Sequence, residues 1–114
     1  METRGKIVYL SGERNDSVNA KVNFAIAEQF MLNTGCIVIN PTKLDVICPE
    51  FTAEEANLLC YKMIEMSDVV LMVSGWQKSN IANAEMNYAR SIGKKVMYQE
   101  YYHQCRRKHD EEST

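Results

Sequence analysis

The chain has 114 residues, a length typical of one domain, with 46% hydrophobic and 25% charged residues. Its formal net charge of −2 gives no electrostatic reason to expect binding to nucleic acid or to an anionic membrane surface. No apolar run approaches the length of a transmembrane helix and residues 1–6 lack the hydrophobic stretch of a signal peptide, so we expect a cytoplasmic protein with no membrane partner.

The first third of the chain predicts a strand, a helix and a second strand. Residues 6–11 form an apolar run typical of a central parallel strand, and residues 36–39 form another that Pro41 brings to an end. Between them, residues 18–33 predict a helix that stops at Gly35. The side chains that we expect this helix to turn toward the sheet are Val22, Ala25, Ile26 and Phe30.

A capping box marks the start of the next predicted helix. Thr52 and Glu55 have the spacing at which each side chain caps the other's backbone N–H, and the helix runs on to about residue 66. The side chains expected to face inward from it are Ala56, Leu59, Cys60, Met63 and Ile64.

The last elements complete an alternating pattern of strands and helices. A strand over residues 69–73 is followed by a helix with Ser79 at its N-cap and by a strand over residues 95–98. This alternation predicts an α/β fold, a small flavodoxin-like or Rossmann-like three-layer sandwich with a mainly parallel sheet of four to five strands. We assign residues 1–100 to this single domain and residues 101–114 to a polar C-terminal tail. So small a sheet favours cover by a second copy, in a homodimer or a higher homo-oligomer.

One carboxylate does not fit a plain scaffold. Ala82, Glu85, Met86 and Ala89 are spaced so that they share one face of the last helix, and this face must pack on the sheet. Glu85 is therefore aimed inward, where a carboxylate needs partners or a function.

Chemistry-bearing residues gather at the carboxyl edge of the predicted sheet, where ligands bind in open α/β folds. Hydroxyls, glycine N–H groups and a helix N-terminus suit an anion such as phosphate. A carboxylate beside a tyrosine suits attack on a sugar, or stabilisation of its charge, when a glycosidic bond is cut. The residues expected at this edge are Tyr9, Ser11, Gly12, Asn40, Pro41, Ser74, Gly75, Trp76, Ser79 and Glu85.

Each of these residues also has a plainer structural interpretation. Glu85 could bond a lysine or a backbone group at the seam between helix and sheet, and Tyr9 could be an ordinary core tyrosine. Ser79 is fully explained as an N-cap. Trp76 in a turn is either a lid over a pocket or a dimer contact, and Arg14 is either a phosphate ligand or a solvated loop residue.

The cysteines and histidines do not predict a metal site. No Cys-x-x-Cys pair occurs, which favours free thiols in a reducing compartment, and Cys60 is expected either to pack in the core or to border the pocket. His103, Cys105 and His109 lack a fourth ligand for zinc. Asp68 lies at the amino edge of the sheet, away from the site, and is expected to serve as a turn or cap residue.

Several motifs within residues 6–98 form one pattern, namely Tyr9-Leu10-Ser11-Gly12, Asn40-Pro41, Asp68 before a strand, and Gly75-Trp76 with Ser79 and Glu85. This pattern resembles the nucleoside 2-deoxyribosyltransferase-like superfamily, and within it the small phage- and prophage-associated branch, a domain of unknown function. The resemblance implies a flavodoxin-like fold and dimers or larger assemblies in which neighbouring subunits complete the site. It also implies exchange of bases between deoxynucleosides or hydrolysis of deoxynucleoside monophosphates.

The resemblance assigns roles to single residues. It implies that Glu85 is the nucleophile, that Tyr9 positions it, and that Ser79 contacts sugar or phosphate. Arg14 matches loosely an arginine of the phosphate-binding loop. The residues expected to bind substrate are Ser11, Gly12, Arg14, Gly75, Trp76 and Ser79.

Two functions remain open. The first is a cofactor-independent enzyme, an N-glycosidase or deoxyribosyltransferase, that cleaves the base from a nucleoside, a nucleotide or a nicotinamide dinucleotide. The alternative is a non-catalytic binder of a nucleotide-like ligand, such as a signal molecule sequestered in conflict between phage and host. Three positions depart from the superfamily pattern: Ile81 replaces a glycine, Glu13 lies beside the phosphate loop, and Cys60 replaces an aspartate of the characterised hydrolases. Ile81 and Glu13 favour the binder, whereas the intact Tyr9, Ser79 and Glu85 favour the enzyme.

Overall fold

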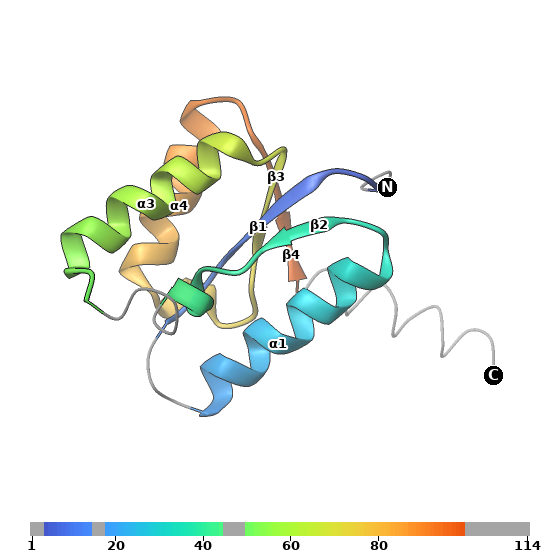
Figure 1. Ribbon diagram of the computed structural model, residues 1–114, viewed down its shortest axis with the longest axis horizontal. Coiled ribbons are helices and arrows are strands. Elements are labelled where there is room, and N and C mark those ends of the chain that lie inside the picture. The colour runs from blue at the N-terminus through green and yellow to red at the C-terminus, as the bar shows by residue number, and fades with distance from the viewer. Residues whose placement is uncertain (1–3, 15–17, 45–49, 100–114) are drawn as a thin grey trace.

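The computed structural model describes residues 4–14, 18–44 and 50–99 (Figure 1). In this part of the chain one sheet is formed by the strands β1 (Ile7–Ser11), β2 (Ile37–Ile39), β3 (Val69–Met72) and β4 (Lys95–Tyr98). The helices are α1 (Val18–Asn33), α3 (Ala53–Met66) and α4 (Asn80–Ser91), with short 3-10 turns η1 (Pro41–Lys43) and η2 (Trp76–Lys78). The strand order is β2-β1-β3-β4 and every pair is parallel, which confirms the predicted α/β class and four-stranded sheet.

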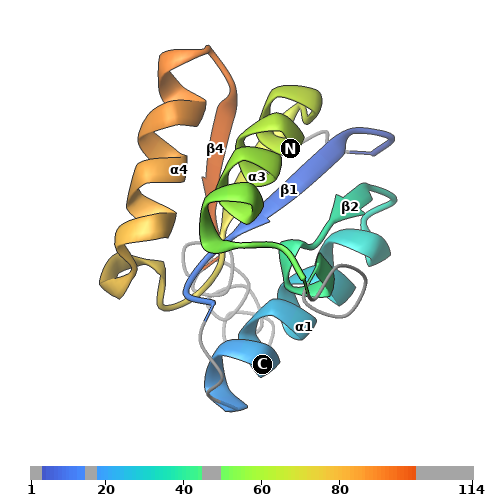
Figure 2. The ribbon, with the colours of Figure 1, turned by 60° about the vertical axis from the view of Figure 1, so that its left-hand side comes forward.

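The helices lie in two layers, one on each face of the sheet. Helix α1 covers one face alone, whereas α3 and α4 cover the other, as Figures 1 and 2 show. Strand residues alternate between the two layers because successive side chains of a strand point to opposite faces. Val8 and Leu10 pack in the cluster beneath α1, while Tyr9, Val70 and Met72 pack beneath α3 and α4.

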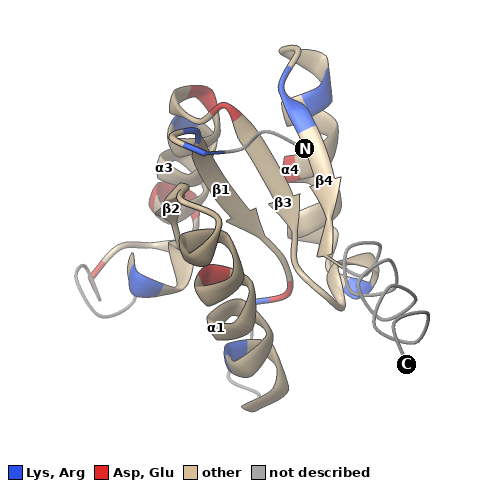
Figure 3. Ribbon diagram, turned by 90° about the vertical axis from the view of Figure 1, so that its right-hand side faces the viewer, with Lys and Arg blue, Asp and Glu red and all other residues tan. Residues whose placement is uncertain are grey.

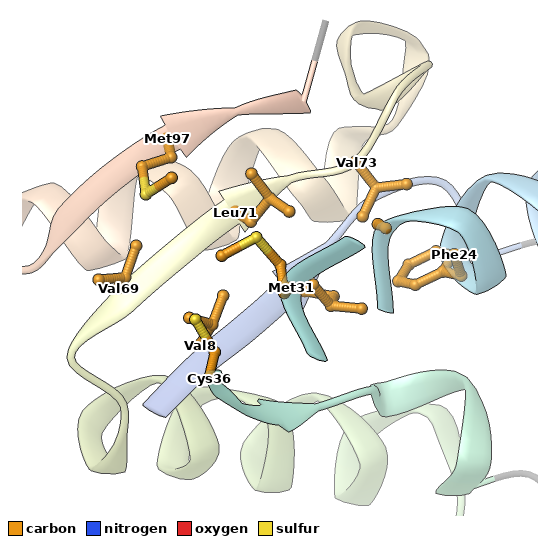
Figure 4. Close-up of a cluster of buried hydrophobic side chains, with 10 residues drawn as sticks. Val8, Phe24, Met31, Cys36, Val69, Leu71, Val73 and Met97 are labelled. Carbon is orange, nitrogen blue, oxygen red and sulfur yellow. The ribbon is translucent and has the colours of Figure 1, made fainter. Parts of the chain in front are cut away.

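The cluster beneath α1 is the apolar half of the molecule. Figure 4 shows strand side chains and residues of α1 meeting there, among them Phe24 and Met31, which are almost fully buried. Branched and sulfur-containing side chains fill the layer between helix and strands, and burial of an aromatic side chain such as that of Phe24 contributes about 1.5–3 kcal/mol. This layer holds β1 and β3 rigidly from one side.

The predicted helix termini are confirmed by the structure. Thr52 and Glu55 form the reciprocal capping box at the start of α3. Ser79 is the N-cap of α4, where its hydroxyl accepts a hydrogen bond of 3.1 Å from the backbone N–H of Ala82. Asp68 accepts a hydrogen bond from the N–H of Ile7 at the amino edge of the sheet, the capping role that the sequence predicts.

The predicted inward face of α1 is wrong. The helix buries Phe24, Met31, Ala20 and Ala27, and it leaves its opposite side in solvent. The error has a physical cause. Apolar residues occur all around α1, so their spacing fits two opposite faces and does not decide between them. Three residues that were expected inward, Val22, Ala25 and Ile26, are exposed. The fourth, Phe30, is partly buried and packs against the cluster beneath α1, as predicted.

The predicted polar C-terminal tail, residues 101–114, lies outside the described residues. It includes the histidines and Cys105 that were considered as zinc ligands. In the ranges that are described, no helix has both the length and the apolar character needed to cross a membrane.

Candidate functional site

The candidate site lies where the direction of the chain across the sheet reverses. From β1 the chain passes through α1 to β2 on one side, and from β3 it passes through α4 to β4 on the other. The connections therefore diverge above the carboxyl ends of β1 and β3, which leaves room for a ligand between them. Tyr9 and Ser11 lie at this end of β1, on the face that α3 and α4 cover.

Glu85 is the centre of the site. It projects from the second turn of α4 toward β1 and retains only 2% of its accessible surface. The Tyr9 hydroxyl donates a 3.0 Å hydrogen bond to Oε2, and the Ser11 hydroxyl donates a 2.7 Å hydrogen bond to Oε1. Because both donors come from one strand and the acceptor from a helix packed on it, the carboxylate has one defined orientation.

Arg14 is the third partner of this carboxylate. Its Nη2 lies 3.3 Å from Glu85 Oε2, and its Nη1 donates to the sulfur of Cys60 at 2.9 Å. The side chain is only 16% exposed, so the solvated interpretation of Arg14 is wrong. Burial lowers the pKa of the guanidinium, but the negative charge of Glu85 and the neighbouring Tyr9 and Cys60 raise it, and the net direction is upward. Arg14 is thus a permanent cation paired with Glu85.

Tyr9 is held in its neutral form. Burial, followed by the charge of Glu85 and the proximity of Cys60, raises the pKa of the phenol well above its ordinary value, and the nearby Arg14 opposes this shift. A neutral phenol keeps its proton and therefore always donates to Glu85. The Tyr9 hydroxyl is consequently a hydrogen-bond donor that orients the Glu85 carboxylate.

A pocket opens beside Glu85, between the N-terminal halves of α3 and α4. Its volume is about 190 Å³, on the scale of a nucleobase or a small sugar. The carboxylate is thus buried on the side of β1 yet borders a space that a ligand can enter. The residues that line this pocket are Asn57, Tyr61, Asn80, Ile81, Ala84 and Glu85.

The remaining predicted site residues have structural roles at the same edge. A side chain on Gly12 would come within 2.9 Å of Val73 Cβ, so close packing alone requires this glycine. Gly75 has φ of 90°, the left-handed region that favours glycine, and it starts η2. The ring of Trp76 packs at 5.6 Å from that of Tyr98 and is not among the side chains that line the pocket. Ligand binding by these residues and by Ser79 stays a prediction.

Several residues of the site were not identified from the sequence. From the sequence, Cys60 is expected only to pack in the core or to border the pocket, whereas in the structure it also accepts a hydrogen bond from Arg14. Asn57 and Tyr61 are one helical turn apart on α3, a spacing that places them together but does not show that they meet α4. Gln99 is buried and its side chain accepts a 2.6 Å hydrogen bond from the N–H of Ser74, which ties the turn after β3 to the end of β4.

The described residues hold no candidate metal centre. Within residues 4–14, 18–44 and 50–99, no three His, Cys, Asp or Glu side chains are placed to hold a metal ion. The functional groups that the described contacts bring together at this edge of the sheet are a carboxylate, a phenol, a hydroxyl, a thiol and a guanidinium.

Comparison with known proteins places the chain in a family without assigning an activity. A search of curated proteins found no significant match. A family model does match, and it covers residues 6–98, which include every strand of the sheet together with Glu85 and the side chains that contact it. The chain belongs to the family described as Domain of unknown function (DUF4406).

Proposed function

We propose that the protein breaks or exchanges the N-glycosidic bond of a nucleoside or nucleotide, as a member of the nucleoside 2-deoxyribosyltransferase-like superfamily. The observation that carries this proposal is the placement of Glu85. It is buried, oriented by Tyr9 and Ser11, located at the carboxyl edge of the sheet, and open to a pocket on one side. A scaffold needs no carboxylate in that position.

In this mechanism Glu85 acts on C1′ of the sugar. A carboxylate oxygen has two lone-pair sites, and Oε2 accepts from both Tyr9 and Arg14, whereas Oε1 accepts from Ser11 among the described contacts. Oε1 is thus the freer oxygen for attack. It forms a bond to C1′ as the bond from C1′ to the base breaks, and the electron pair leaves with the base. Water then releases the sugar in hydrolysis, or a second base does so in transfer.

The pocket supplies the contacts for the base and sugar. Its two asparagines carry amide donors and acceptors, and Tyr61 offers a ring that is itself braced by the ring of Tyr88 at a centroid distance of 4.8 Å. Gly12, Ser79 and the N-terminus of α4 would hold the 5′ end of the substrate. Trp76 would close over the ligand.

Arg14 positions Glu85 in this proposal. The sequence suggests a phosphate ligand, but both terminal nitrogens are engaged by Glu85 and Cys60. A cation bound to Oε2 holds the carboxylate in place and leaves Oε1 to react. Arg14 is therefore a positioning residue whose loss would displace the nucleophile.

Non-catalytic binding of a nucleotide-like ligand is the second candidate, and the ion pair itself favours it. A carboxylate that is paired with an arginine is a weaker nucleophile than one held by neutral donors alone. Ile81 is partly exposed and lines the pocket, so it narrows the approach to the N-terminus of α4. In this function Glu85 would accept hydrogen bonds from a ligand hydroxyl and form no bond to carbon.

A base-release assay separates the two functions. Purified protein is incubated with deoxynucleosides, ribonucleosides, their monophosphates and a nicotinamide dinucleotide, and the free base is measured by chromatography. We expect release by the wild type and release reduced at least about a thousandfold in Glu85→Gln. Release should be unchanged in Glu28→Gln, because Glu28 is a carboxylate on α1 that pairs with Lys43, on the other face of the sheet. Absence of release from every substrate, together with calorimetric binding that persists in Glu85→Gln, would refute catalysis and support the binder.

A further inference from the structure

Helices α3 and α4 carry a row of side chains that extends from the pocket toward the C-terminal halves of both helices. The two helices lie side by side on one face of the sheet (Figures 1 and 2). Asn57, Tyr61 and Glu65 follow one another at intervals of four residues on α3, so they share one face of that helix. Ala84 and Tyr88 have the same spacing on α4. Tyr61 and Ala84 line the pocket, whereas Tyr88 and Glu65 meet beyond it.

Contacts beyond the pocket hold the ring of Tyr61. The Tyr88 ring meets it edge-on, with the ring centroids 4.8 Å apart and the ring planes at 63°. The Tyr88 hydroxyl in turn donates a 2.6 Å hydrogen bond to Oε2 of Glu65. This hydrogen bond lowers the pKa of the Glu65 carboxyl, so Glu65 stays a charged acceptor at neutral pH. Two side chains that do not line the pocket thus orient one that does.

The pocket suits a flat, uncharged group. Among the described residues that line it, Glu85 alone is charged and Tyr61 alone is aromatic. Most of α4 is tan in Figure 3, and Glu85 is its one acidic residue. Asn57 and Asn80 add side-chain amides, which both donate and accept hydrogen bonds. An aromatic face together with amides is the chemistry that holds a nucleobase, by stacking on the ring and by hydrogen bonds at the edge of the base.

We propose that the ring of Tyr61 is the surface on which the base of a nucleoside stacks, and that Tyr88 and Glu65 are positioning residues for this ring. Stacking strengthens with the area of the base, so the pocket should favour purines over pyrimidines. A base on Tyr61 leaves the sugar on the side of Glu85, because the two residues line the same pocket from different helices. The inference rests on the proposed function for the class of ligand, but not for the cleavage of its glycosidic bond.

Calorimetric titration with deoxyadenosine and with deoxycytidine tests the stacking. Tyr61→Leu should weaken the binding of deoxyadenosine about ten- to hundredfold, because one stack between base and ring is lost. The loss should be smaller for deoxycytidine, whose base is a single ring. Tyr61→Phe keeps the aromatic face and should bind both nucleosides within about twofold of the wild type. Unchanged affinity of Tyr61→Leu for deoxyadenosine overturns the proposal, and so does a wild type that binds neither nucleoside at about 10 mM.

A measurement on the wild type does not depend on whether Tyr61→Leu folds. The ring current of a stacked tyrosine shifts the ring protons of a bound purine upfield in proton NMR. We expect this upfield shift for deoxyadenosine bound to the wild type and to Tyr61→Phe, and its loss in Tyr61→Leu. Deoxyadenosine that binds the wild type without this shift overturns the stacking.

Variants beyond the pocket test the positioning role. Glu65→Ala and Tyr88→Leu should each weaken the binding of deoxyadenosine about two- to tenfold, because the ring of Tyr61 loses its support. Glu65→Gln should restore most of the affinity, since its amide oxygen can accept the hydrogen bond from Tyr88. Lys62→Ala is the matched control, because Lys62 lies 3.5 Å from Oε1 of Glu65 and leaves the contact of Oε2 with Tyr88 in place. Unchanged binding in Tyr88→Leu overturns the positioning role.

The base-release assay distinguishes failure of this inference from failure of the proposed function. Binding that depends on Tyr61, without release of base, supports the stacking and refutes the cleavage. Release of base that is unchanged in Tyr61→Leu overturns the stacking and leaves the cleavage by Glu85 intact.

Discussion

The ion pair between Arg14 and Glu85 makes the sharpest prediction about how the site is held together. Arg14→Met keeps much of the length of the side chain and removes its charge, and Glu85→Gln keeps the shape of the carboxyl group and removes its charge. We expect each substitution alone to reduce the free energy of unfolding by about 3–5 kcal/mol, because each leaves the other group charged and buried without its partner. The free energy of unfolding of the double variant should fall by clearly less than the sum of the two single reductions.

The size of the coupling follows from distance and burial. At the Nη2–Oε2 separation of 3.3 Å, two unit charges attract by ~5 kcal/mol at an effective dielectric constant of about 20, and by ~1 kcal/mol in water. The Arg14 side chain is 16% exposed and that of Glu85 only 3%, so the effective dielectric constant around the pair is closer to about 20 than to that of water. A coupling free energy of about 2–4 kcal/mol is therefore expected.

Equilibrium denaturation in urea measures this coupling, as a four-protein cycle of wild type, the two single variants and the double variant. The exposed pair Lys62–Glu65 is the control, because its N–O distance of 3.5 Å is almost the same while its side chains are 68% and 42% exposed. The coupling free energy of this control pair should be less than about 0.5 kcal/mol. If the Arg14–Glu85 coupling is no larger than that of Lys62–Glu65, the argument that burial gives this pair its strength is refuted.

Three further predictions concern stability. Because folding raises the pKa of Tyr9, the contribution of Tyr9 to the free energy of unfolding is complete below pH ~10 and falls above it by up to about 1.4 kcal/mol per pH unit. Urea denaturation between about pH 9 and 11 should show this pH-dependent fall in the wild type and not in Tyr9→Phe. Gly12→Ala should lower the free energy of unfolding by about 1–3 kcal/mol, since the new methyl group meets Val73 and Phe24, and a loss below about 0.5 kcal/mol would contradict the packing argument. Ser79→Ala should cost about 1 kcal/mol through loss of the N-cap, whereas Ser79→Asp should retain the stability in the same thermal-unfolding assay.

Most of the fold could be predicted because its signals are local. The runs around Tyr9 and Val70 are short and apolar on both faces, which is typical of central parallel strands. The capping box at Thr52 marks the start of one helix. The inward orientation of Glu85 followed from its spacing with Ala82 and from the requirement that one face of α4 covers the sheet.

What could not be predicted depends on contacts between distant segments. The sequence places Arg14 in a loop after a strand, and no periodicity in a loop indicates where a long side chain reaches, so its pairing with Glu85 could not be derived. The face of α1 was assigned wrongly for a related reason. When both sides of a helix are apolar, only the packed structure shows that Phe24 faces the sheet and Ile26 faces away from it.

The composition of the layer beneath α3 and α4 is itself an argument for function. Most of this layer is apolar, and residues such as Val70, Met72 and Ile64 would hold the sheet and helices together without help. A buried ion pair adds no more stability than apolar side chains of the same volume, and often adds less. The polar set around Glu85 is therefore poorly explained by folding alone. It occurs at the one edge where the topology leaves space for a ligand and where a pocket opens beside the carboxylate. Departures from the packing rules that coincide with such a place are characteristic of functional sites.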